Sequence, residues 1–260
     1  MQYETVLFEQ NNGIATLTLN RPDVFNAFND QLSFDVMAVL KHIQKENTAR
    51  VLVITGAGKA FCSGQDLKAI SGSKNRSLSD SLYNRYNPMI KAIRELPIPV
   101  LCRLNGVAAG AGCSLALACD MIIASENAAL IEVFVNVGLV LDSGSSYFLP
   151  RLVGSARAFE LSTMGSKLTA QQAFEWGIIN RVVALDKLDD ELNKFTEYYA
   201  KAPTKAIGMM KKMLNKSSHS SLDEMLQYEA YCQEIAGRSN DYKEGVAAFN
   251  EKRKPEFKGM

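Results

Sequence analysis

The sequence is poor in the residues that build metal centres and disulfide frameworks. It has two histidines and five cysteines, an odd number without a CxxC pair: Cys62, Cys102, Cys113, Cys119 and Cys232. All five lie in apolar segments, so we expect them to be reduced, mostly buried and not metal ligands. Cys62 and Cys113 lie beside glycine-rich turns, but neither His42 nor His219 lies in a recognisable partner motif, which disfavours a nucleophilic thiol.

Long apolar runs and an excess of charge are also missing. No stretch approaches roughly 18 uninterrupted apolar residues, and the opening MQYETVLFEQ lacks a basic segment followed by an apolar run. Neither membrane insertion nor export is therefore expected, and the expected location is the cytoplasm. With 29 basic and 28 acidic residues, the net charge of +1 gives no electrostatic reason to expect a nucleic-acid or membrane partner.

Strand-like runs, glycine turns and helical patterns alternate over much of the chain. At 260 residues with 47% hydrophobic content, it is long enough for one large domain or a domain with an appendage. Strands are predicted at 3–8, 14–19, 51–55, 100–104, 121–124 and 182–183, the first two joined by an Asn-Asn-Gly hairpin turn. Helices are predicted at 31–46, 155–165 and 169–176, the last with Thr169 as its N-cap. This order favours an α/β layer fold with sites at the carboxyl ends of strands.

Two other segments have a different character. Residues 71–80, SGSKNRSLSD, are polar and predict a mobile surface loop before a helix that contains Tyr83 and Tyr86. From Leu185 onward the pattern is all helical, with helices predicted at 187–201, 204–215, 221–236 and 240–251. Because these helices cannot bury their apolar stripes alone, they should cover the core or meet another subunit.

The stretch NGVAAGAGCSLALACD, residues 105–120, places Gly110, Ala111 and Gly112 before a buried helix. A helix N-terminus with small residues exposes N–H groups that can hold a negatively charged oxygen. A second turn, Ser63-Gly64-Gln65-Asp66, follows the strand VLVIT. If the two strands are neighbours, both turns can direct N–H groups at one oxygen and form an oxyanion hole. Two tight turns without a ligand remain the alternative.

A third segment, VGLVLDSGSS, places Asp142 among apolar residues beside a small-residue loop. Apolar surroundings disfavour the charged form, which raises the pKa of a carboxyl and improves it as a base near neutral pH. An aspartate at this spacing also suits the cap of the following helix, and spacing alone favours the cap.

Five motifs in order resemble the crotonase, or enoyl-CoA hydratase/isomerase, superfamily: NRPDVFNAF, GKAFCSGQDL, NGVAAGAGCSLALACD, GLVLDSGSSYFLPRLVG and AFEWGIINRVV. The resemblance covers nearly the whole chain. It implies an α/β fold with a spiral core of ββα units over residues 1–185 and an all-helical trimerisation segment over residues 186–260. It further implies a homotrimer or a homohexamer built as a dimer of trimers.

The resemblance also implies an acyl-CoA thioester substrate, with no cofactor beyond the coenzyme A that the substrate carries. The oxyanion-hole amides fall on Gln65 and on Ala111, where the family usually has glycine. Phe249 and Lys252 in the tail resemble positions that reach the coenzyme A of a neighbouring subunit. The remaining substrate-binding positions implied are Asp23, Val24, Ala60, Ser63, Gly64, Asp66, Leu67, Gly110 and Phe134.

Departures from the family pattern point to the reaction. Hydratases of the family carry two glutamates that activate water, and the matching positions here are Ser114 and Phe134. Asp142 matches an aspartate of an isomerase branch, so the expected activity is a Δ3 to Δ2 enoyl-CoA shift or isomerisation of a ring-1,2-epoxyphenylacetyl-CoA to an oxepin. These expectations connect the protein to fatty-acid metabolism or phenylacetate catabolism. The segment 68–90 and residues near Phe134, Tyr147 and Phe148 are expected in the wall of the acyl pocket, where the aromatic side chains would suit a cyclic or bulky substrate.

Three alternatives remain open. A hydratase would need groups other than Ser114 and Phe134 to hold water. An aryl-CoA dehalogenase would use Asp142 to attack the ring. A non-catalytic protein would bind acyl-CoA without turning it over.

Overall fold

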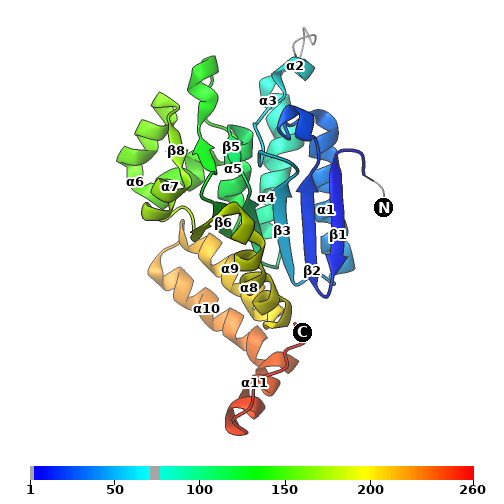
Figure 1. The fold of residues 1–260 in the computed structure, drawn as a ribbon. Helices are drawn as coiled ribbons and strands as arrows, with labels where there is room; N and C mark the ends of the chain where they lie inside the picture. The colour runs from blue at the N-terminus through cyan, green and yellow to red at the C-terminus, as the bar shows by residue number, and fades with distance from the viewer. Residues whose placement is uncertain (1–2, 71–76) are drawn as a thin grey trace.

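The structure is a computed structural model that describes residues 3–70 and 77–260 (Figure 1). Its first half contains β1 (Val6–Asn11), β2 (Ile14–Leu19), η1 (Pro22–Val24), α1 (Asp30–Glu46), β3 (Val51–Gly56), α2 (Leu67–Ile70), α3 (Leu78–Ser81), η2 (Leu82–Tyr86), α4 (Asn87–Glu95), β4 (Val100–Leu104), β5 (Val107–Ala109), α5 (Ala111–Ala118) and β6 (Met121–Ser125). Its second half contains β7 (Ala129–Ile131), η3 (Val133–Val137), α6 (Ser145–Met164), β8 (Lys167–Thr169), α7 (Ala170–Glu175), β9 (Arg181–Val183), η4 (Leu185–Lys187), α8 (Leu188–Lys201), α9 (Thr204–Ser217), α10 (Leu222–Gly237) and α11 (Asn240–Asn250).

The larger sheet has the strand order β1-β2-β3-β4-β6-β9. β1 and β2 form the predicted antiparallel hairpin, which Asn12 and Gly13 close with positive φ angles of 51° and 80°. The remaining neighbours are parallel, including β3 beside β4. Because parallel strands present their carboxyl ends at one edge, the turns that follow β3 and β4 start from the same edge of the sheet.

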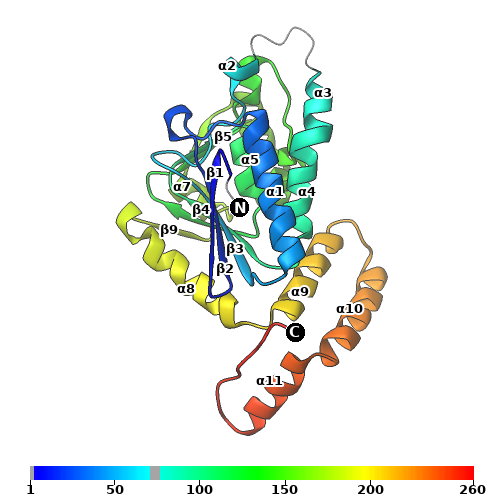
Figure 2. The same cartoon turned by 90° about the vertical axis from the view of Figure 1, so that its right-hand side faces the viewer.

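The faces of this sheet are covered by helices from different parts of the chain. Leu52 and Ile54 of β3 belong to the main core, which also contains buried residues of α1 and α4. Val51 and Val53 point to the opposite face and form a second cluster with Leu188 and others of α8. Figure 2 shows α1 and α4 on one side of the strands and α8 on the other. The predicted role of the C-terminal helices in covering the core is therefore confirmed for α8.

A second, three-stranded sheet in the order β5-β7-β8 was not predicted. Its strands have three residues each, which is too short for a periodic apolar pattern to reveal them. With it, the chain repeats one unit: a strand of the large sheet, a strand of the small sheet and a helix. The first repeat is β4, β5 and α5, and the second is β6, β7 and α6.

Two helical segments differ from the prediction. α6 begins at Ser145 instead of residue 155, and it is interrupted at Gly154, where φ is 77° and ψ is 167°. In the predicted 71–80 loop, residues 71–76 lie outside the described part of the chain. Residues 78–80 are helical, because the Ser77 hydroxyl accepts a hydrogen bond from the backbone N–H of Asp80 and caps α3.

The helical C-terminal third is confirmed by α8 to α11. Local capping explains several of these boundaries, since Ser221 and Glu224 form a capping box at the start of α10, as Thr169 and Gln172 do at α7. The division of the chain at residue 185 stays a prediction. Within residues 3–70 and 77–260, no helix combines the length and apolar character needed to cross a bilayer.

Candidate active site

The two glycine turns meet where β3 and β4 end. The chain after β3 pairs with the start of the small sheet through a Cys62–Ala108 bridge, and the Ala109 N–H donates to the Cys62 carbonyl at 2.9 Å. Gly64 has a φ of 90°, and a Cβ there would lie 2.8 Å from the Ala109 oxygen and 3.5 Å from the Ala111 nitrogen. β3 and β4 are neighbours, so the condition for the two turns to converge is met, and Gly64 permits their close approach.

The backbone amides of Gln65 and Ala111 donate to no other group among the described residues. Their neighbours are paired: the Asp66 N–H donates to the Phe28 carbonyl at 2.9 Å, and the Gly110 N–H donates to the Ile131 carbonyl at 2.9 Å. Ala111 is the first residue of α5, where helix geometry leaves N–H groups without intrahelical partners. Two such N–H groups in one cavity can donate hydrogen bonds to an oxygen that gains negative charge.

These turns open into a cavity of about 320 Å³. It is lined by Ser63, Gly64, Gln65, Leu67, Leu78, Ser81, Leu82, Tyr86, Gly110, Ala111, Val133, Phe134, Asn136, Val137, Leu139, Val140, Leu141 and Asp142. Its walls are mainly leucine, valine and aromatic side chains. Asp142 is the one carboxylate among the described residues that line it.

Asp142 lies in the loop between η3 and α6. The Ser143 hydroxyl donates to its Oδ1 at 2.7 Å, but burial dominates and raises the pKa of the Asp142 carboxyl above its ordinary value. The helix-cap interpretation that spacing favoured is wrong, because the N-cap of α6 is Gly144 and no side chain caps it. The Asp142 side chain does not cap α6 and instead lines the cavity.

The predicted pocket wall is only partly right. Phe134 lines the cavity, together with Leu78, Leu82 and Tyr86 from the segment after residue 77. Tyr147 and Phe148 are not lining residues; they contact each other edge to face at 5.4 Å between ring centroids, on the first turn of α6. Tyr86 has a role that the sequence did not suggest, since its hydroxyl donates to Gln65 Oε1 at 2.7 Å and helps to fix the Gln65 turn.

The substrate-binding positions implied by family resemblance fall into groups. Five line the cavity: Ser63, Gly64, Leu67, Gly110 and Phe134. Val24 lies beside it, because the Ser63 hydroxyl donates to the Val24 carbonyl at 3.3 Å. Asp66 instead pairs with Arg21 at 3.0 Å, while Ala60 is buried and Asp23 is exposed in η1.

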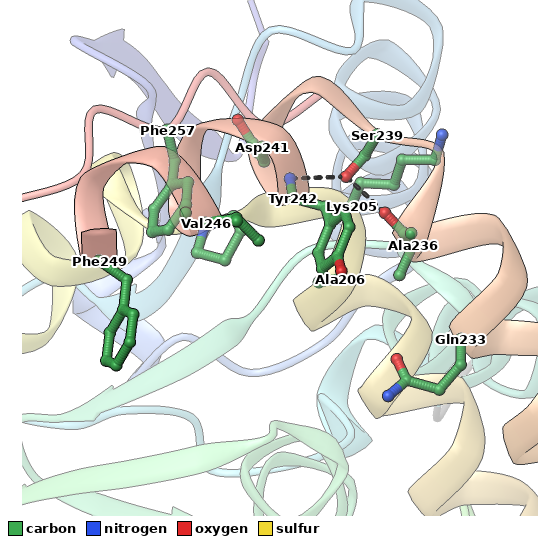
Figure 3. A pocket seen from close by; sticks show the side chains of 13 residues that line it. Lys205, Ala206, Gln233, Ala236, Ser239, Asp241, Tyr242, Val246, Phe249 and Phe257 are labelled. Carbon is green, nitrogen blue, oxygen red and sulfur yellow. Dashed lines mark hydrogen bonds between the residues drawn. The ribbon is translucent and has the colours of Figure 1, made fainter. Parts of the chain in front are cut away.

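Phe249 and Lys252 are not brought to this cavity within one chain. Phe249 is on α11, which lies at the opposite end of the molecule from α2 and β5 (Figures 1 and 2). It borders a separate cavity of about 610 Å³, and Figure 3 shows side chains of α9, α10 and α11 around it. Contact of the tail with a neighbouring subunit's coenzyme A stays a prediction.

The cysteines behave as core residues. All five are buried, and burial raises the pKa of the Cys62 thiol to about 12 and that of Cys113 well above its ordinary value. A thiol that holds its proton is a poor nucleophile. Among the residues that the structure describes, no group of three histidine, cysteine, aspartate or glutamate side chains is placed to hold a metal ion.

A carboxyl that sequence reasoning missed lies directly behind the cavity. Glu132 is 3% exposed, and burial raises its pKa from 4.5 to about 7. Ser114, one of the two positions matched to hydratase glutamates, is fully buried in the same region and is not part of the cavity wall. The available signal was a single acidic residue inside the apolar run ALIEVFV.

Comparisons with known proteins agree over the whole chain. The sequence model of a family described as Enoyl-CoA hydratase/isomerase matches residues 9–260. The 1,2-epoxyphenylacetyl-CoA isomerase of Escherichia coli is 41% identical over 98% of this chain and 99% of its own. A probable enoyl-CoA hydratase of Rhodobacter capsulatus is 39% identical over the full length of both.

A solved structure shows the same architecture. The crystal structure of a putative enoyl-CoA hydratase from Streptomyces coelicolor matches with a TM-score of 0.94 and 32% identity, covering 100% of this chain and 96% of that one. The predicted fold, a spiral α/β core with a helical C-terminal segment, is thereby confirmed.

Proposed function

The chain belongs to the enoyl-CoA hydratase/isomerase family, and on this basis we propose that it is a cofactor-independent acyl-CoA isomerase. One observation carries the proposal: among the described residues, Asp142 is the single carboxylate of an apolar cavity that also contains the backbone amides of Gln65 and Ala111, which have no partner there. One base and one oxyanion site are sufficient to move a proton from one carbon to another in the acyl chain of a thioester.

In the proposed reaction, the thioester oxygen accepts hydrogen bonds from the Gln65 and Ala111 N–H groups. Asp142 removes a proton from the α carbon, and the electrons of that C–H bond form an enolate whose charge gathers on the oxygen. The two amides stabilise this charge in a site with little water. The raised pKa of Asp142 supports its role, because a carboxylate that holds its proton more tightly is a stronger base.

The same carboxyl then returns the proton to the γ carbon. The original double bond moves from between the β and γ carbons to between the α and β carbons, so a Δ3 thioester becomes the conjugated Δ2 thioester. No atom is gained or lost. Hydration is disfavoured, because Ser114 and Phe134 supply no carboxylate at the positions where the hydratases of the family hold water.

A ring epoxide is a second candidate substrate. The E. coli relative is named a 1,2-epoxyphenylacetyl-CoA isomerase, and aliphatic and aromatic walls such as Leu82, Tyr86 and Leu139 would suit a flat ring. The same enolate, formed with Asp142 as base, would assist ring expansion to an oxepin.

We further propose that the protein works as a trimer or a dimer of trimers. α9, α10 and α11 expose large apolar side chains, including Leu214 at 73%, Leu222 at 73% and Phe249 at 84%. Apolar side chains such as Val246, Phe249 and Phe257 also line the cavity among these helices, next to polar ones such as Lys205 and Asp241 (Figure 3). A second copy of the chain would bury these surfaces.

The test of the proposed reaction is Asp142→Asn, assayed with a Δ3-enoyl-CoA. Conversion to the conjugated thioester should fall by about 10² to 10⁴, the usual contribution of a general base, while acyl-CoA binding is retained. Wild-type protein in D₂O should incorporate deuterium at the α or γ carbon, and the variant should not. Asp80→Asn is the matched control, since Asp80 is an exposed aspartate of α3 outside the cavity wall.

Other outcomes identify the alternatives. Unchanged turnover by Asp142→Asn would eliminate Asp142 as the base. Formation of 3-hydroxyacyl-CoA would identify a hydratase, and chloride release from a chlorinated aryl-CoA would identify a dehalogenase. Acyl-CoA binding without turnover of any thioester would indicate a binding protein.

A further inference from the structure

Glu132 is a buried carboxyl for which the proposed reaction has no direct use. It follows β7 and precedes η3, and its Oε1 accepts a hydrogen bond from the Ser145 hydroxyl at 2.8 Å. The Cys113 thiol also points to Oε1, at 3.4 Å. Oε2 is buried and has no hydrogen-bond partner among the described residues. Because burying a carboxyl this completely is unfavourable, such a group needs an explanation.

A chain of hydroxyls leads from Glu132 toward the cavity. Ser145 Oγ lies 2.8 Å from Ser114 Oγ, and both side chains are fully buried. Ser114 Oγ also lies 3.2 Å from the Gly110 carbonyl and 3.2 Å from the Asp142 carbonyl. Ser114 therefore joins the turn that carries one proposed oxyanion donor to the loop that carries the proposed base.

The Gly110 carbonyl is part of the peptide group whose N–H belongs to Ala111. A hydrogen bond to this carbonyl holds the peptide plane and polarises it, which strengthens the N–H as a donor. The Asp142 carbonyl is already bonded by the Ser145 N–H at 3.0 Å, so the Ser114 hydroxyl adds a second anchor to the base loop.

We propose that Glu132 is a positioning residue that, through the hydroxyls of Ser145 and Ser114, holds the Ala111 peptide and the Asp142 loop in the geometry for enolate formation. The inference rests on the proposed function of this cavity. It assigns Glu132 no contact with substrate.

The direction in which the hydroxyls of Ser145 and Ser114 donate their hydrogen bonds depends on whether the Glu132 carboxyl is protonated. An ionised carboxylate accepts a hydrogen bond from Ser145, and Ser145 Oγ can then accept one from Ser114, in which case neither carbonyl has a hydroxyl donor. A protonated carboxyl can donate to Ser145 instead, so that Ser145 donates to Ser114 and Ser114 donates to a carbonyl. Each serine has one proton to give, so the two directions exclude each other.

Both directions are accessible near neutral pH. Burial raises the pKa of Glu132 to about 7, and the nearby Asp142 charge adds to this, while the hydroxyl of Ser145 and the thiol of Cys113 oppose it. The pKa of Cys113 is itself raised by burial and by Glu132, so this thiol stays protonated in the same range. Glu132 is thus the group that changes charge.

The test compares pH profiles of wild type, Glu132→Gln and Ser114→Ala from about pH 5 to about pH 9. In wild type, kcat should fall above about pH 7 by about fivefold, the factor that corresponds to one hydrogen bond of roughly 1 kcal/mol. Glutamine cannot ionise, and its NH₂ group can donate to Ser145 at every pH, so Glu132→Gln should keep full kcat and lose this fall. Ser114→Ala should show the lower kcat throughout, and Glu126→Gln, at an exposed glutamate between β6 and β7, should behave as wild type.

A second readout needs no turnover. Butyryl-CoA carrying ¹³C at the thioester carbonyl is bound to each protein, and its carbonyl stretching band is followed by infrared spectroscopy over the same pH range. The band should shift to lower frequency as pH falls through about 7 in wild type, and it should be independent of pH in Glu132→Gln.

These readouts separate the two proposals. If the carbonyl band follows Glu132 but no Δ3 thioester is isomerised, the proposed reaction is wrong and the positioning role stands. If isomerisation occurs but Glu132→Gln retains the wild-type pH dependence in rate and carbonyl band, the positioning role is overturned. If the labelled thioester does not bind, both proposals fail.

Discussion

Replacing Glu132 by glutamine should make the stability of the protein less dependent on pH. The carboxyl is 3% exposed, and its pKa rises from 4.5 to about 7 on folding. Between these two values the native state binds more protons than the unfolded state. The unfolding free energy of wild type therefore decreases as pH rises through this interval, and the contribution of Glu132 is constant above it.

The magnitude follows from the size of the pKa change. A tenfold change in an ionisation constant corresponds to about 1.4 kcal/mol, so ionisation of Glu132 costs the native state about 3 kcal/mol at high pH. Glutamine cannot ionise and avoids this cost. Its buried amide introduces an unfavourable contribution of its own, but that contribution does not change with pH.

The quantity to measure is the difference in unfolding free energy between Glu132→Gln and wild type. It should increase by about 3 kcal/mol in favour of the variant from about pH 4.5 to about pH 7.5. Urea unfolding at fixed protein and salt concentration gives both free energies. Asp142 also has a raised pKa, but it is present in both proteins and largely cancels.

The exposed Glu126 provides the matched control, because Glu126→Gln should leave the same difference flat. A flat difference for Glu132→Gln as well would refute the reasoning. It would mean that Glu132 is ionised in the native state at no cost, with a partner or water at Oε2.

Two further results are expected. Gly64→Ala should reduce isomerisation by about 10² to 10³, because a Cβ at this position would displace the Ala109 carbonyl and disturb both proposed oxyanion donors. Gly138→Ala is the control and should retain activity, since Gly138 also has a positive φ but no atom lies within 4 Å of the added Cβ. Equal losses of activity in the two variants would argue against the oxyanion hole. Light scattering should give a trimer or hexamer mass, and Phe249→Asp should shift it toward the monomer if α11 contributes to the interface; a monomeric wild type would contradict the assembly proposal.

The turns at Gly64 and Gly110–Gly112 could be predicted because their signal is local. A β-branched run, a glycine turn and an apolar helix pattern lie within a few residues of one another. The adjacency of β3 and β4 then follows from the ordinary preference for short connections in parallel sheets. The helices from 188 onward were predictable for a similar reason, since apolar residues recur over several turns and Ser221 and Glu224 mark a start.

The small sheet and the position of the Asp142 side chain had no comparable local signal. β5, β7 and β8 are too short for a period, and they exist because they pair with one another. A loop aspartate before a helix suits either a cap or a base. The positive φ angles of Ser143 and Gly144, 51° and 89°, accompany a loop in which Asp142 lines the cavity and does not cap the helix.

The sequence by itself determined the alternation of strands, turns and helices, and with it the two glycine turns, because backbone hydrogen bonding and apolar periodicity act over short distances. Only the tertiary structure decided where the carboxyls lie. Asp142 and Glu132 are ten residues apart in the chain, yet one lines the cavity and the other is enclosed behind it. Burial and hydrogen-bond partners set the pKa of each, and both depend on which segments the fold packs around them.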